Sequence, residues 1–229
     1  MTPLSLAAAT WPQVPSGPVA LVPVGSTEQH GPHLPFCTDS LIAERAAQAV
    51  ADVLSEQGFG PVIVTPVLAF GASGEHQAFP GTVSIGHDAL RAVLVEAVRS
   101  ISTWAQRTVF VNGHGGNVGT LGAVREQMTF EGHRVDWFPC AFETATDAHA
   151  GMEETSVMLH LSPSLVDMTA AAPGELSPLA ELLPRLMAEG VRPVSPSGVL
   201  GDPTRATAEH GRGLFDALVR RLAGQISHG

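Results

Sequence analysis

The sequence has 229 residues, of which 44% are hydrophobic, and this is enough to bury the core of one globular domain. Its 12 basic and 22 acidic residues give a net charge of −10, which argues against nucleic acid or an anionic membrane as a partner, because both require a basic patch. Each apolar stretch is shorter than the roughly 18 residues of a membrane span, and the amino terminus lacks the basic region of a signal peptide. The two cysteines, Cys37 and Cys140, form neither a metal-binding pair nor a disulfide framework. We therefore expect a single domain over residues 1–229 in the reducing cytoplasm.

The predicted elements alternate between strands, recognised as short apolar or β-branched runs, and helices with apolar residues three and four apart. In chain order they are strand 19–24, helix 38–57, strand 61–68, helix 88–105, strand 108–112, helix 118–131, strand 134–139, and helices 153–161, 179–189 and 204–223. This alternation predicts an α/β fold of three layers, α/β/α, in which helices cover both faces of a mostly parallel sheet.

Charged and imidazole side chains are concentrated directly after the first predicted strand. Glu28 and His30 are two residues apart, so in an extended segment they point the same way and can reach one point, and Asp39 opens the next helix. Carboxylate and imidazole together suit a divalent cation of borderline hardness, such as zinc, manganese or ferrous iron, whereas calcium and magnesium prefer oxygen alone. This segment alone also fits a polar loop that faces water.

Two further clusters follow the strand at 108–112 and precede the helix at 153–161. His114 lies in Asn112-Gly-His-Gly-Gly-Asn117, where glycines let the backbone approach a ligand closely, and the segment contains neither dinucleotide nor phosphate-loop motif. His149 precedes the first helical turn with Glu153 and Glu154, whose charges also suit the helix dipole. Because ligands of parallel sheets bind at the carboxyl ends of the strands, the combination of clusters favours a metal site.

Four motifs, in their order along the chain, resemble those of the creatininase family. They are Gly25-Ser-Thr-Glu-Gln-His-Gly-Pro-His-Leu-Pro35 with Asp39, Glu75-His76 with Phe79-Pro-Gly-Thr82, Asn112-Gly-His-Gly-Gly-Asn117, and His149-Ala-Gly-Met-Glu-Glu-Thr-Ser156. The resemblance covers most of the chain from residue 20 to 161. It implies a creatininase-like three-layer fold, a homo-oligomer, and hydrolysis of amide bonds with two divalent metal ions per chain, Fe²⁺, Zn²⁺ or Mn²⁺.

The resemblance also implies roles for individual residues. The residues that match the ligands of a first ion are Glu28, Asp39 and His114. His30, with Asp39 as a bridge, matches the ligands of a second ion. Creatininase has a further glutamate ligand where this sequence has Gly116, so Glu154 is expected to complete the second site. His149 matches the catalytic histidine, and the residues expected to act in acid–base catalysis are His149 and Glu154. The residues expected to contact substrate are Glu75, His76 and His33.

Within the family, the stretches 71–77, 155–163 and 198–207 look most like those of a subgroup of peptidases. That likeness implies a modified small ribosomal peptide as the substrate, cleaved at its carboxyl terminus. Two alternatives stay open at this point. One is an amidohydrolase for a small cyclic amide or formamide, of the creatinine or formamidopyrimidine type, and the other is a non-catalytic metal-dependent scaffold.

Overall fold

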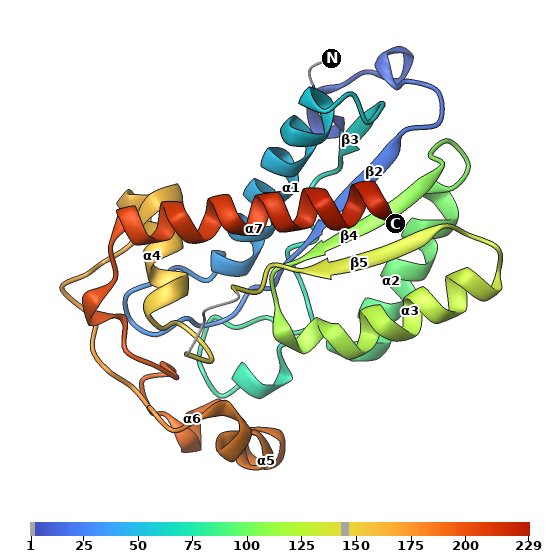
Figure 1. Cartoon of the computed structure of the whole chain (residues 1–229). Coiled ribbons are helices and arrows are strands. Elements are labelled where there is room, and N and C mark those ends of the chain that lie inside the picture. Colours follow the sequence, from blue (N-terminus) through green and yellow to red (C-terminus); the bar gives the residue numbers. More distant parts are fainter. Residues whose placement is uncertain (1–2, 143–146) are drawn as a thin grey trace.

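Within residues 3–142 and 147–229, which the computed structural model describes, five parallel strands form one sheet in the order β1-β3-β2-β4-β5 (Figure 1). The strands are β1 (Leu4–Ser5), β2 (Val19–Val24), β3 (Val62–Val64), β4 (Arg107–Asn112) and β5 (Val135–Pro139). The central strands β2 and β4 are buried along their whole length and pair from Val19 opposite Arg107 to Val24 opposite Asn112. Their carboxyl ends therefore lie side by side, and the polar residues that follow each strand are brought together.

Helices cover both faces of this sheet, which confirms the predicted three-layer α/β fold. The described helices are α1 (Thr38–Glu56), α2 (Gly86–Ile101), α3 (Val118–Phe130), α4 (Met152–Leu161), α5 (Leu179–Glu189), α6 (Val191–Val194) and α7 (Ala208–His228). Side chains alternate along β2, so that Leu21 packs with α1, α4 and α7 in one core while Val22 packs with α2 and α3 in the other. Figure 1 shows α7 crossing one face of the sheet.

Several predicted boundaries differ from the structure for local reasons. The strand predicted at 61–68 is reduced to Val62–Val64, because Pro61 and Pro66 have no backbone N–H to donate to a neighbouring strand. The helix predicted at 204–223 begins only at Ala208 and runs to His228, since the Thr207 side chain caps it by accepting the backbone N–H of His210. The strand β1, only two residues long, has no counterpart among the predictions.

The hairpin of α5 and α6 lies beyond the carboxyl edge of the sheet (Figure 1). It is attached through Leu182 and Val194, which pack against Leu200 and Ala148 of the segments that border the polar cluster. Among the described helices, none combines the length and apolarity that crossing a membrane requires.

Candidate metal centre

The polar cluster forms where β2 and β4 end and the first turn of α1 packs against both strand ends. Gly25 follows β2, and a side chain there would overlap Ser40 of α1. Gly113 follows β4, and a side chain there would overlap the backbone carbonyl of Asp39. Glycine at both positions therefore lets α1 come close enough to place the Asp39 carboxylate between the two strand ends.

The first group of side chains consists of Glu28, Asp39 and His114, all buried. His114 Nδ1 lies 3.2 Å from Glu28 Oε2 and 3.3 Å from Asp39 Oδ2. The other ring nitrogen, Nε2, lies 3.1 Å from the carbonyl oxygen of Ala72 and donates its hydrogen there. A neutral His114 therefore turns a lone pair toward two carboxylate oxygens. Such an arrangement of facing acceptors needs a cation, or a proton in its place, to be stable.

The electrostatics of this first group follow from the same geometry. Burial and the charge of Asp39 oppose ionisation of Glu28, yet the nearby imidazoles of His114 and His76 lower the pKa of Glu28 to about 2. Burial would lower the pKa of His114, but the carboxylates of Glu28 and Asp39 raise it well above its usual value. Without a metal ion, His114 is thus protonated at Nδ1, and this proton lies between the ring nitrogen and the carboxylates of Glu28 and Asp39.

The second group repeats this pattern on the other oxygen of Asp39. His30 Nδ1 donates to the carbonyl oxygen of Glu28 at 3.1 Å, so that Nε2 turns a lone pair toward Asp39 Oδ1 at 3.0 Å. Burial disfavours a charged His30, but the adjacent Asp39 carboxylate raises the pKa of His30 to about 9. His149 and Glu154 approach His30 closely enough to complete a group of three possible metal ligands. Asp39 is therefore placed to bridge two cation positions, one on each oxygen.

His149 is held by a backbone pairing with Leu200. Its backbone pairs with that of Leu200 in both directions, at 3.2 and 2.9 Å. Its Nε2 donates to the carbonyl oxygen of Gln29 at 2.8 Å, which turns Nδ1 toward the cluster, 4.0 Å from Glu28 Oε1. Burial, together with the positive charge on neighbouring histidines, lowers the pKa of His149 well below its usual value. The ring is therefore neutral and can accept a proton at Nδ1.

Glu154 lies in the first turn of α4, and its carboxylate is close to both His30 and His149. It accepts the backbone N–H of Ala150 at 2.5 Å, and Ala150 has a positive φ of 51°. Burial raises the pKa of Glu154 to about 7. The carboxylate thus supports a loop conformation that a non-glycine residue rarely adopts, and it can exchange a proton near neutral pH.

One expectation about the first motif is wrong. Glu28 and His30 do not reach one point: the Glu28 carboxylate lies 3.2 Å from His114 Nδ1, whereas His30 Nε2 lies 3.0 Å from Asp39 Oδ1. The two side chains belong to separate groups that meet at Asp39.

The structure brings two of the three expected substrate contacts to the cluster. His76 is buried, with Nε2 at 3.4 Å from Glu28 Oε1. Glu75 lies on the outer side of His114, with Oε1 at 3.7 Å from Nε2. A side chain at Gly116 would need the space that this carboxylate, the Ala72 carbonyl and the His114 ring already fill, which accounts for glycine there.

His33 is not brought to the centre. Its Nε2 lies 2.9 Å from the hydroxyl oxygen of Thr155 in α4, and burial lowers the pKa of the ring. This contact ties the loop after β2 to α4, away from the side chains that line the cavity described next.

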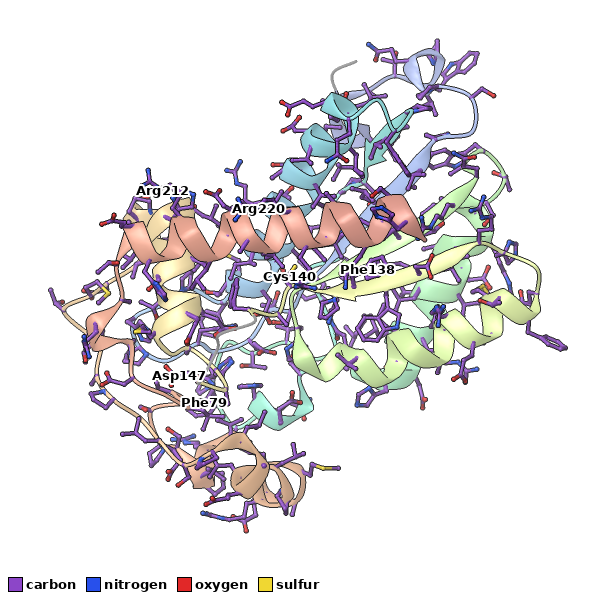
Figure 2. All side chains as sticks on the ribbon, viewed as in Figure 1. Phe79, Phe138, Cys140, Asp147, Arg212 and Arg220 are labelled. Atoms are coloured by element: carbon purple, nitrogen blue, oxygen red, sulfur yellow. The ribbon has the colours of Figure 1, made fainter. Side chains whose placement is uncertain are left out.

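A cavity of about 250 Å³ opens beside the cluster between β5 and the start of α4. His114, His149 and Glu154 line its inner side, and Cys140 and Phe142 belong to its wall. Figure 2 shows Cys140 directly after the end of β5 and Asp147 between that point and the α5–α6 hairpin. Such a cavity can hold a small group next to the facing acceptors while limiting the access of water.

Two residues of the centre have no role in the sequence predictions, although both lie in the first motif. The Ser26 hydroxyl donates to Asp39 Oδ2 at 2.7 Å. The Gln29 side chain contacts His76 and His149 at 2.8 and 3.2 Å. Their position next to Glu28 and His30 in the sequence could have identified them, because polar residues that neighbour metal ligands often orient those ligands.

Comparison with known proteins connects this centre to a family of hydrolases. Over residues 7–226 the chain matches the creatininase family, described as creatinine amidohydrolase. It is 51% identical over 209 residues to the mycofactocin precursor peptide peptidase of Mycolicibacterium smegmatis. This match covers 91% of this chain and 84% of that protein. The protein of the same name from Mycobacterium tuberculosis is 49% identical over 228 residues, or 95% of this chain and 90% of that protein. The creatinine amidohydrolase of Pseudomonas putida is 26% identical over 239 residues, with coverages of 91% and 88%.

Solved structures show the same fold. A protein from Bacteroides fragilis assigned to the creatinine amidohydrolases superimposes with a TM-score of 0.81 at 26% identity, covering 99% of this chain and 96% of that one. A creatininase in a manganese form and another in a Zn–Zn form have TM-scores of 0.78 and 0.77, at 24% and 23% identity. The two superpositions cover 99% and 100% of this chain, and each covers 98% of the creatininase chain.

Proposed function

This chain belongs to the creatininase family and is a hydrolase that acts on carbon–nitrogen bonds, and from that premise we propose that it is a metal-dependent peptidase of mycofactocin biosynthesis. Its substrate would be the modified precursor peptide, cleaved at an amide bond near the carboxyl terminus. The choice of a peptide over creatinine is supported by identities of 49–51% to the mycofactocin precursor peptide peptidases, against 26% to a creatinine amidohydrolase.

The observation that carries the metal-dependent part of the proposal is the pair of facing acceptors on either side of Asp39. We propose two divalent ions per chain, Fe²⁺, Zn²⁺ or Mn²⁺, because mixed nitrogen and oxygen ligands accept all three. The first ion would be held by Glu28, Asp39 and His114, and the second by His30, Asp39 and Glu154. When bound, such ions polarise a carbonyl group and make hydroxide available near pH 7.

The chain's own residues supply the positioning and the proton transfer. Asp39 is fixed by the Ser26 hydroxyl and by the first turn of α1, so its two oxygens keep their directions. His149, neutral and oriented by the carbonyl of Gln29, would accept a proton at Nδ1 from the attacking water and deliver it to the leaving nitrogen. Glu154, beside His149 and His30, would share in this transfer.

Replacement of His149 by alanine tests this assignment. We expect the variant to keep both metal ions, measured by elemental analysis of anaerobically purified protein, and to hydrolyse the modified precursor peptide about 10²- to 10⁴-fold more slowly, as is typical for a lost acid–base group. His160→Ala is the matched control, because His160 lies on α4 outside the cluster and should retain activity. Unchanged turnover would remove His149 from the mechanism, and loss of one ion would make it a ligand instead.

The substrate is tested with the wild-type protein. Hydrolysis of the modified precursor peptide, but not of creatinine or a formamidopyrimidine, is the expected result. Turnover of either small molecule in preference to the peptide would favour the amidohydrolase alternative, and metal binding without turnover of any would favour a scaffold. Assembly as a homo-oligomer and a cytoplasmic location also remain proposals, which sedimentation and cell fractionation can check.

A further inference from the structure

Four buried histidines surround Glu28 and Asp39, and three of them share one hydrogen-bonding pattern. His30, His114 and His149 each donate one ring N–H to a backbone carbonyl, respectively of Glu28, Ala72 and Gln29. Each therefore turns the lone pair of its other nitrogen inward. The fourth, His76, has no such carbonyl partner among the described contacts, and its Nδ1 instead lies 2.8 Å from the side-chain Nε2 of Gln29.

The orientation of the Gln29 amide is determined by two backbone groups. Its Oε1 accepts the N–H of Gly31 at 2.8 Å, and its Nε2 donates to the carbonyl of Gly198 at 3.2 Å. Exchanging oxygen and nitrogen would remove the contact of two donors between Gln29 Nε2 and His149 Nε2 at 3.2 Å, but it would bring two donors together at Gly31 and two acceptors together at Gly198. Gly198, with φ of 85°, also has to be glycine, because a side chain there would overlap the Gln29 amide.

This orientation fixes the hydrogen on His76. Because Gln29 Nε2 is a donor, Nδ1 of His76 has to be the acceptor, and the neutral ring carries its hydrogen on Nε2. That nitrogen lies 3.4 Å from Glu28 Oε1, so the N–H of the ring is on the side of the carboxylate. Glu28, His76 and His149 are close enough to form a third group of possible metal ligands, but His76 has no lone pair left for a cation.

We propose that Gln29 is a positioning residue that holds His76 in the Nε2–H tautomer, which excludes His76 from metal binding and makes it the donor that orients Glu28. With Oε1 held by His76, Oε2 of Glu28 is directed at His114 and the first ion position. The cations are thereby confined to the two positions on either side of Asp39. This inference rests on the proposed metal centre and is independent of the proposed peptide substrate.

The test is the tautomer of His76 in zinc-loaded protein labelled with ¹⁵N-histidine, read from two-bond ¹H–¹⁵N correlations and assigned by the signals lost in His76→Gln. We expect an unprotonated Nδ1 and a protonated Nε2 in the wild type. In Gln29→Glu, the carboxylate offers His76 an acceptor in place of a donor, so the hydrogen should move to Nδ1. The zinc affinity of the first site should then fall about 10- to 100-fold, as for other lost partners of metal ligands. Gln77→Glu, with the same charge change on an exposed residue beside His76, should alter neither readout.

The wild-type spectrum decides the proposal even if Gln29→Glu fails to fold. A hydrogen on Nδ1, or direct coupling of His76 to ¹¹³Cd in cadmium-substituted protein, would overturn it. Unchanged zinc affinity in a folded Gln29→Glu protein with a switched tautomer would overturn the role in orienting Glu28. Absence of peptide hydrolysis alongside the expected tautomer would instead contradict the proposed function, so the two failures are distinguishable.

Discussion

The two ends of strand β4 both bury charged groups, but they do so in opposite ways. At the amino end, the Arg107 guanidinium lies 2.7 Å from Asp136 through Nη2, donates through Nε to the same carboxylate at 3.0 Å, and donates through Nη1 to the carbonyl of Ile226 at 2.8 Å. At this end the N–H donors of Arg107 thus face the oxygen acceptors of Asp136 and Ile226. At the carboxyl end, His114 turns a lone pair toward the carboxylates of Glu28 and Asp39.

This difference separates a structural ion pair from a binding site. The Arg107 pair joins β4, β5 and the end of α7, and its charges are balanced within the fold without any ligand. The acceptors at the other end are complete only with a proton or a metal cation between them, so binding of a metal ion there displaces a proton. Buried acceptors that face one another, as those of Glu28, Asp39 and His114 do, are therefore a better indication of a cation site here than the number of buried charges.

The largest expected effect comes from removing the shared acceptor in Asp39→Asn, which keeps the shape of the side chain. The amide removes the negative charge between both cation positions and can turn a donor toward His30 or His114. Metal affinity at both positions should fall by more than about 100-fold, the upper end for residues that only orient a ligand, and hydrolysis should be lost. Elemental analysis and thermal unfolding check this together. Wild-type metal content in the variant would contradict the bridging role of Asp39.

At the other end of β4, Arg107→Met should reduce the free energy of unfolding by about 2 kcal/mol, because it leaves the buried carbonyl of Ile226 without this donor and the carboxylate of Asp136 with Arg125 alone. Metal content should not change, since the pair lies at the opposite edge of the sheet. Urea denaturation of the metal-free protein measures the effect, with the exposed Arg91→Met as control. If Arg107→Met also lost metal, the two ends of β4 would not be independent.

The sequence contained enough information to predict the central layers and most of the carboxylates and imidazoles of the cluster, but not Ser26 or Gln29. The apolar residues of β2 and the run Val109-Phe-Val111 in β4 identify buried strands, and the glycines after each strand identify the ends where Glu28 and His114 follow. The exact ends of helices and the shortest strands were harder to predict. The two-residue strand β1 was missed, and α7 begins at Ala208 instead of at the predicted residue 204. Such boundaries depend on individual caps and prolines rather than on periodicity.

The hydrogen-bonding pattern of the centre could not be predicted from the sequence. The lone pair of His114 faces inward because Ala72, 42 residues away, offers a carbonyl to the other nitrogen. His76 meets Gln29 across 47 residues. These contacts arise only when the loops after β2, β3 and β4 are assembled, so residue type and spacing identify the participants but not which of their atoms face the ion.

The smallest expected effect is that of removing the Ser26 hydroxyl, which contacts the metal ligand Asp39, compared with removing the Ser40 hydroxyl, which does not. The hydroxyls of Ser26 and Ser40 are both buried, but Ser26 donates to Asp39 Oδ2 at 2.7 Å, whereas Ser40 donates to the backbone carbonyl of Ser26 at 2.8 Å. Each alanine variant should lose about 1 kcal/mol of stability. Only Ser26→Ala should also weaken zinc binding, by about tenfold, because it alone frees the bridging carboxylate to rotate. Equal zinc affinities in the two variants, measured by competition with a chelator, would show that the first turn of α1 positions Asp39 without help from the hydroxyl.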